Sequence, residues 1–164
     1  MSSGIQSEPP PWHAAFPAPK ATPGAIPASQ LLAMIKQWRT SDKPTHLLVD
    51  VRRNDHEGGT ISTSVNLPAQ TMYYSLSTLV ALVKATQSIK SVIFYCGASR
   101  GRGPRSAGWF QDALDEFGIE DVKSYILEGG IKGWVKQGRN QGPEEMLMLM
   151  EGYEAGYWDQ FMDG

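Results

Sequence analysis

The chain has 164 residues, a formal net charge of −2 at pH 7 and a composition that is 41% hydrophobic and 20% charged. This length suits one domain with a real core, and the charge argues against general nucleic-acid binding. The one cysteine excludes an internal disulfide and a cysteine-built zinc site. A single cysteine also fits a reducing compartment. The sequence has no pattern typical of a membrane helix or a signal peptide. We therefore expect a cytoplasmic or nuclear protein with no metal site that binds neither membrane nor nucleic acid.

Residues 1–27 hold most of the prolines in the chain. Proline fixes φ and removes a backbone donor, so this stretch is unsuited to a helix or a central strand. A disordered tail is one interpretation. However, Trp12, Phe16 and Ile26 place large apolar side chains among the prolines. They favour an N-terminal arm that lies across the surface of the domain.

Residues 28–140 alternate between helical and strand-like patterns, which predict one domain. Apolar periodicity, caps and turn residues predict helices over 28–40, 75–87, 103–118 and 129–138. Short runs rich in β-branched and aromatic residues predict strands over 45–52, 64–68, 91–96 and 123–127. Apolar strands that alternate with helices are typical of an α/β fold, in which helices cover both faces of a parallel sheet.

Residues 141–164 form an acidic segment with apolar residues at helical spacing: Met146, Met150, Tyr153, Tyr157 and Phe161. The pattern predicts a C-terminal helix that packs on the domain. A helix that binds a partner or forms a homodimer is the alternative.

The stretch CGASRGRGPR, residues 96–105, contains the one cysteine, at the end of a predicted strand and before a predicted helix. In open α/β sheets, ligands bind beyond the carboxyl ends of the strands. Small residues can turn backbone N–H groups toward an anion, and the positive end of a helix favours the same ligand. Arg102 follows Cys96 by six positions, and its planar fork can grip two oxygens of one tetrahedral anion.

The positive surroundings of Cys96 also favour its thiolate, which is the nucleophilic form. The loop is therefore predicted to hold an oxyanion above an activated sulfur. The alternative is a buried, inert cysteine ahead of a solvated basic turn. No residue stands out as a general acid, although Asp50, Asp55 and Glu57 are candidates by their position.

Three motifs resemble those of rhodanese domains, over about residues 28–137. DVRRNDHEGGTISTSVNLP resembles the first rhodanese signature, and LEGGIKGWVKQG resembles the closing motif. The loop is longer than a sulfurtransferase loop. It resembles the C-x5-R-Gly-Pro loop of two groups with this fold, the phosphatases that activate cyclin-dependent kinases and the eukaryotic arsenate reductases. The resemblance implies a rhodanese-like α/β domain.

The resemblance also implies roles for individual residues. Cys96 would be the nucleophile and Arg102 the oxyanion clamp, and Asp50 would steady the loop or Arg102. The oxyanion would be bound by the residues of the loop: Gly97, Ala98, Ser99, Arg100, Gly101 and Arg102. Arg100 and Arg105 are candidate contacts to a phosphorylated partner. Tyr95 departs from the family, which usually has histidine before the cysteine, and Thr60 departs from a Gly-Gly-His pattern.

Four functions follow from this interpretation. The first is a phosphatase of the tyrosine or dual-specificity kind, which acts on a phosphorylated substrate through a phosphocysteine intermediate and needs no cofactor. The second is arsenate reduction on the same loop. Because Cys96 has no second cysteine to resolve it, the electrons must come from an external thiol, with glutathione and a glutaredoxin as the expected partners. A thiosulfate sulfurtransferase and a non-catalytic interaction module are the third and fourth.

Overall fold

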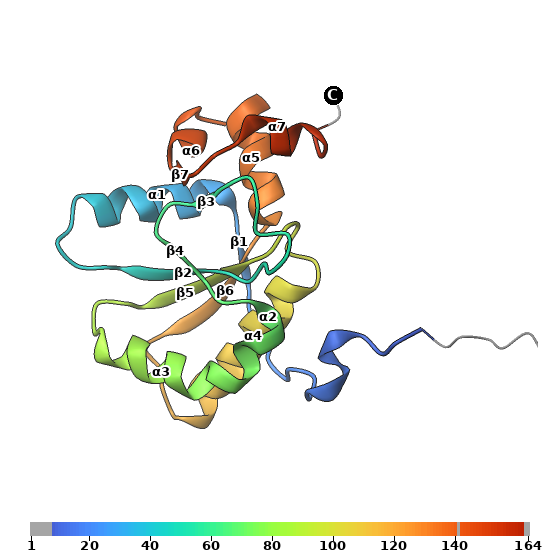
Figure 1. Cartoon of the computed structure of the whole chain (residues 1–164). Helices are drawn as coiled ribbons and strands as arrows, with labels where there is room; N and C mark the ends of the chain where they lie inside the picture. The colour runs from blue at the N-terminus through green and yellow to red at the C-terminus, as the bar shows by residue number, and fades with distance from the viewer. Residues whose placement is uncertain (1–7, 141, 163–164) are drawn as a thin grey trace, which may run out of the picture.

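The computed structural model of the chain describes residues 8–140 and 142–162 (Figure 1). The first seven residues of the expected arm lie outside this range, as do Gln141, Asp163 and Gly164 of the expected C-terminal helix.

The core of the protein is a five-stranded parallel sheet in the order β1-β6-β5-β2-β4. The strands are Ala25–Ile26 (β1), His46–Asp50 (β2), Ser64–Asn66 (β4), Ser91–Tyr95 (β5) and Lys123–Leu127 (β6). In this register Asp50 pairs with Tyr95 at the carboxyl ends of β2 and β5. Two neighbouring strands therefore end side by side, at the edge where the sequence predicts the site.

Helices cover both faces of the sheet (Figure 1). On one face lie Ala28–Arg39 (α1), Gly130–Asn140 (α5), Glu145–Met148 (α6) and Ala155–Asp159 (α7). On the other lie Ala69–Met72 (α2), Leu76–Ala85 (α3) and Arg102–Glu116 (α4), with a single 3-10 turn, Tyr73–Ser75 (η2), between α2 and α3. The α/β fold with helices on both faces is thus confirmed.

Strand pleating divides the core into two clusters. In β5, Ile93 and Tyr95 face the cluster with α1 and α5, while Val92 and Phe94 face the cluster with α3 and α4. The predicted strands and helices of residues 28–140 all occur, with ends shifted by a few residues. The central strands β2 and β5 are apolar and mostly buried, as expected for a sheet covered on both faces.

The described part of the N-terminal arm, from residue 8 on, contains Trp12–Ala15 (η1), a 3-10 turn, and β1. Trp12 and Phe16 are half-buried, which confirms that the arm lies against the domain. The sequence did not predict a strand at the end of the arm. Ala25 and Ile26 form β1, which pairs with Ile126 and Leu127 as an edge strand of the sheet.

The prediction of one C-terminal helix is wrong. The segment forms two short helices, α6 and α7, separated by Met150–Glu151 (β7), which pairs antiparallel with Thr60–Ile61 (β3). Gly152 has φ +68 and ends the pairing, a conformation that a helix cannot contain. The helical spacing of the methionines is real, but pairing with β3 overrides it.

Candidate active site

The loop from Cys96 to Gly101 joins β5 to α4 and lies at the carboxyl edge of the sheet. Cys96 is buried, with 4% of its surface exposed, and its Sγ accepts a hydrogen bond of 3.3 Å from the N–H of Gly103 in the first turn of α4. A Cβ on Gly103 would lie 3.5 Å from this sulfur. The N-terminus of α4 thus lies directly against the thiol, where its positive end favours a bound anion.

The start of α5 fixes the backbone of the loop from the other side. The N–H groups of Ile131 and Lys132 donate to the carbonyls of Cys96 and Gly97, at 3.1 and 2.9 Å. Gly130 has φ +59, and a Cβ there would overlap both carbonyls. The motif LEGGIKGWVKQG therefore contributes to the site, because its N–H groups bind two carbonyls of the loop that would otherwise be free to face the anion.

Ser99 adds a free hydroxyl to the loop. It has φ +54, a left-handed conformation that is rare for a serine. Its Oγ is buried and has no hydrogen-bond partner among the described residues. A buried hydroxyl without a partner retains its donor for a ligand.

Arg102, the first residue of α4, forms a bidentate ion pair with Asp55. Its NH1 and NH2 groups donate to Oδ1 and Oδ2 of Asp55 at 2.7 and 2.5 Å. The hydrogen bonds from Arg102 lower the pKa of Asp55 to about 2. Asp55 is therefore a carboxylate at neutral pH, which makes it a partner of Arg102 and a poor proton donor.

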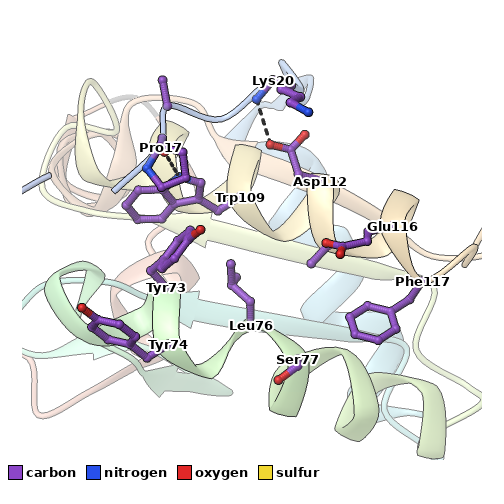
Figure 2. A pocket seen from close by; sticks show the side chains of 12 residues that line it. Pro17, Lys20, Tyr73, Tyr74, Leu76, Ser77, Trp109, Asp112, Glu116 and Phe117 are labelled. Carbon is purple, nitrogen blue, oxygen red and sulfur yellow. Dashed lines mark hydrogen bonds between the residues drawn. The ribbon is translucent and has the colours of Figure 1, made fainter. Parts of the chain in front are cut away.

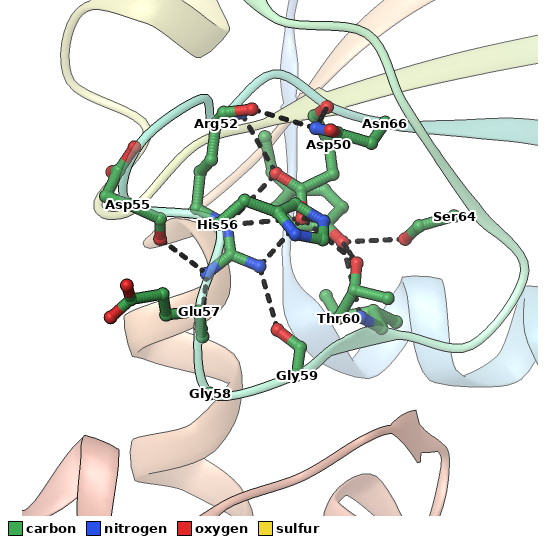
Figure 3. A network of polar contacts seen from close by, with 12 residues as sticks. Asp50, Arg52, Asp55, His56, Glu57, Gly58, Gly59, Thr60, Ser64 and Asn66 are labelled. Carbon is green, nitrogen blue, oxygen red and sulfur yellow. Dashed lines mark hydrogen bonds and ion pairs between the residues drawn. The ribbon is translucent and has the colours of Figure 1, made fainter.

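Asp50 contacts a different arginine, Arg52 (Figure 3). It is fully buried and accepts hydrogen bonds from Arg52 Nε at 3.0 and 3.2 Å and from Arg52 NH2 at 2.8 Å. The hydroxyl of Thr60 donates to it at 3.0 Å, and His56 Nε2 lies 3.4 Å away. Asp50 thus hydrogen-bonds to Arg52, and its expected role in steadying the loop or Arg102 stays a prediction.

Arg52 links this buried network to the ion pair. Its guanidinium donates to the carbonyls of Asp55, Glu57 and Gly59, at 3.2, 3.0 and 2.8 Å. It therefore holds the turn that presents Asp55 to Arg102. Asp50 holds Arg52 in place, and Arg52 in turn holds the backbone of the turn next to Arg102.

Tyr95 points away from the sulfur of its neighbour Cys96 and into the same network. Its hydroxyl is within hydrogen-bond distance of Ser64 Oγ at 2.6 Å and Thr60 Oγ1 at 2.8 Å, and it accepts from the N–H of Ile61 at 3.3 Å. Burial raises the pKa of Tyr95, so the phenol is neutral. The departures at Tyr95 and Thr60 thus compensate one another, because each supplies a partner to the other.

A pocket of about 390 Å³ opens over the loop. Its lining includes Cys96 and three arginines, and two residues come from the N-terminal arm: Trp12, His13, Cys96, Ala98, Arg100, Gly101, Arg102 and Arg105. The structure thus brings together Cys96, Arg102 and most of the predicted loop residues. Sequence reasoning missed Trp12 and His13, since the two rings among the prolines indicated an arm but not where it would lie.

Comparison with known proteins places this geometry in a family. A sequence model of the rhodanese-like domain matches residues 28–137. Arsenical-resistance protein 2 of Saccharomyces cerevisiae is 32% identical over 115 residues, which cover 66% of this chain and 85% of the relative. Arsenate reductase 2.1 of Oryza sativa is 30% identical over 123 residues, covering 70% of this chain and 68% of the relative. The dual specificity phosphatase ibp1 of Schizosaccharomyces pombe is 27% identical over 125 residues, covering 66% and 88%.

Solved structures share the fold. Ygr203w, a yeast protein tyrosine phosphatase of the rhodanese family, superposes with a TM-score of 0.68 at 22% identity, covering 84% of this chain and 98% of its own. An As-Sb reductase from Leishmania major superposes with a TM-score of 0.59 at 21% identity, covering 78% and 84%.

Proposed function

The chain belongs to the rhodanese-like domain family, and we propose that it is a cysteine-dependent phosphatase that acts through a phosphocysteine intermediate. One observation carries the proposal. The Cys96 sulfur lies between the end of β5 and the start of α4, in a pocket lined by Arg100, Arg102 and Arg105. This pocket has the charge and the size to hold a phosphate group above the sulfur.

The reaction follows from the groups in the loop. The Cys96 thiolate attacks phosphorus, an S–P bond forms, and the P–O bond to the leaving group breaks. The leaving oxygen takes up a proton. Water then attacks the phosphocysteine, which releases phosphate and restores the thiolate, so no electrons are exchanged and no cofactor is required.

The remaining residues of the loop bind the phosphate oxygens. Backbone N–H groups of Gly97 to Gly101 and the free hydroxyl of Ser99 are the donors. Arg102 supplies the N–H groups that its pair with Asp55 leaves free, and Asp55 holds the guanidinium at the edge of the pocket. Asp50 is a positioning residue in this scheme, because its hydrogen bonds go to Arg52, which holds the turn that carries Asp55.

Arsenate reduction is the second candidate, and the two relatives named for arsenate favour it. Arsenate has the shape and charge of phosphate, so the same loop would hold it. Arsenate gains two electrons when it becomes arsenite. Since Cys96 is the one cysteine of the chain, a thiol such as glutathione, with a glutaredoxin, must supply them.

One purified preparation tests both candidates. We would measure turnover of 4-nitrophenyl phosphate, of arsenate with glutathione and glutaredoxin, and of thiosulfate with cyanide, with Cys96→Ser as the control. We expect the highest kcat/KM for the aryl phosphate and no turnover by the variant. A preference for arsenate would make the chain a reductase, and a preference for thiosulfate would make it a sulfurtransferase. No turnover of any substrate would favour an interaction module.

The place of action in the cell is a separate expectation. Among residues 8–140 and 142–162, no helix is long and apolar enough to cross a membrane. We propose that the protein works in a reducing compartment, since the mechanism requires Cys96 as a free thiol.

A further inference from the structure

We propose that His13, carried into the pocket by the N-terminal arm, is the proton donor to the leaving oxygen. The proposal rests on the phosphatase function above and names an acid that the sequence alone did not reveal. It starts from the position of His13, which lines the same pocket as Cys96 and Arg102.

The arm is fixed to α4 by a site built for it (Figure 2). Trp109 Nε1 donates to the carbonyl of Pro17 at 2.8 Å. The Asp112 carboxylate accepts the N–H groups of Lys20 and Ala21, at 2.8 and 2.9 Å. The groups of the arm in these three hydrogen bonds, one carbonyl and two N–H groups, all belong to the backbone. The hydrogen bonds therefore fix the path of the backbone along α4.

Gly108 allows the arm to lie close to α4. A Cβ at this position would lie 2.7 Å from Cβ of Pro19, which is too close for two non-bonded carbons. The helix that begins at the catalytic loop therefore carries three features that dock the arm: Gly108, Trp109 and Asp112.

Aromatic contacts extend this docking to His13. The ring of Trp12 packs edge-on against Trp109, with centroids 6.0 Å apart, and the ring of His13 packs edge-on against Trp12 at 5.4 Å. Phe16 anchors the other end of the turn against Tyr73 and Trp109, at 4.9 and 5.7 Å. The imidazole is thus placed at the pocket by a chain of rings that begins on α4.

Among the residues that line the pocket, His13 is the side chain suited to donate a proton to the leaving oxygen. Cys96 is the nucleophile, the three arginines keep their protons at neutral pH, and Asp55 is held as a carboxylate by Arg102. Imidazole is the side chain whose ordinary pKa suits proton transfer near pH 7. His13 is the one histidine in the described lining of this pocket.

The step balances in both half-reactions. As the P–O bond breaks, the imidazolium gives its proton to the leaving oxygen, which departs as an alcohol or phenol. The neutral imidazole then accepts a proton from the water that attacks the phosphocysteine, so His13 ends the cycle protonated.

The test compares two aryl phosphates in the wild-type protein and in His13→Asn. Phenol has a pKa of about 10, like that of tyrosine, and needs a proton to leave, whereas the more acidic 4-nitrophenol leaves as its anion. We expect the variant to lose about 100-fold in kcat on phenyl phosphate and only a few-fold on 4-nitrophenyl phosphate. The alkaline fall of the kcat–pH profile for phenyl phosphate should also vanish.

Lys20→Ala is the matched control, because Lys20 lies on the same arm, does not line the pocket and bonds to Asp112 through its backbone N–H, which the substitution keeps. It should leave the ratio of the two substrates unchanged, even if both rates fall. Equal losses on both substrates in His13→Asn, or no loss, would overturn the role of His13. A wild-type protein that is inactive on both substrates would overturn the phosphatase function and the role of His13 together.

Discussion

The arm of residues 8–27 and the C-terminal segment of residues 142–162 both lie outside the region that matches the family, yet they serve the domain differently. The C-terminal segment adds side chains to the core: Met146 and Trp158 are 1% exposed and Leu149 is 4% exposed. The large rings of the arm, at Trp12 and Phe16, are only half-buried, and Trp12 lines the pocket. The C-terminal segment therefore contributes several side chains to the core, whereas the arm contributes Ile26 to the core and Trp12 and His13 to the pocket.

The C-terminal segment also reaches the site, because Phe161 and Met162 line a second pocket with Ser99 and Arg100 of the loop, and because other residues of the segment hold the turn at Gly58. Trp158 Nε1 and the N–H of Glu154 both donate to the carbonyl of Gly58, at 2.7 and 3.2 Å. The pairing of β7 with β3 holds the next residues, Thr60 and Ile61. This segment thus supports the turn that presents Asp55, while the arm places His13 in the pocket itself.

The largest expected difference between the two segments is in how much each contributes to the free energy of unfolding. Trp158→Ala should lower the free energy of unfolding by about 3–5 kcal/mol, since it empties a core site and leaves the Gly58 carbonyl short of a donor. Trp12→Ala should cost about 1 kcal/mol, because its ring is half-exposed. Urea unfolding measures both. Equal losses for the two tryptophans would show that the segments do not differ in this way.

A second substitution should separate the arm from the helix with little change in stability. Gly108→Ala places a methyl group against Pro19 but adds about 1 kcal/mol of helix propensity, so the two effects on stability oppose each other. We expect tryptophan fluorescence to report a more exposed Trp12, and kcat on phenyl phosphate to fall about tenfold or more through misplaced His13. If Trp12 became more exposed and kcat on phenyl phosphate stayed at the wild-type value, the arm would not take part in catalysis.

The smallest expected effect concerns the ion pair supported by the C-terminal segment. The pKa of Asp55 is lowered from its ordinary value to about 2, so the pair stabilises the fold above about pH 4 and its contribution disappears as the pH falls toward 2. Because Asp55 is partly exposed, Asp55→Asn should cost less than about 1 kcal/mol at pH 7. Urea unfolding of both proteins at pH 7 and pH 3 should show the difference shrink in acid. A difference that grows in acid would contradict the assigned pair.

The sequence predicted the parts of the site that are local in the chain. Cys96 and Arg102 belong to one loop between a clear strand and a clear helix, so their proximity followed from spacing alone. Which carboxylate would face Arg102 could not be predicted, because Asp50 and Asp55 lie five residues apart in one motif. The folding of the turn around Arg52 decides it, through hydrogen bonds to backbone carbonyls.

The segments at the two ends show a different reason for failure. The apolar spacing of residues 146–161 is helical, but Met150 pairs with Ile61, nearly ninety residues earlier, and no local pattern announces that pairing. The arm was correctly expected to lie on the domain. Its path to the pocket depends on Gly108 and Asp112, whose spacing on α4 has meaning only once Pro19 and Lys20 lie against them.

The central claim is that Cys96 carries the phosphoryl group during turnover. The direct measurement is to mix the wild-type protein with an aryl phosphate, quench within milliseconds in denaturant, and locate the added phosphoryl group by mass spectrometry of peptides. We expect it on the sulfur of Cys96, and expect it to be absent from Cys96→Ser. A phosphoryl group on another residue, or a Cys96→Ser protein that turns over at the wild-type rate, would contradict the account.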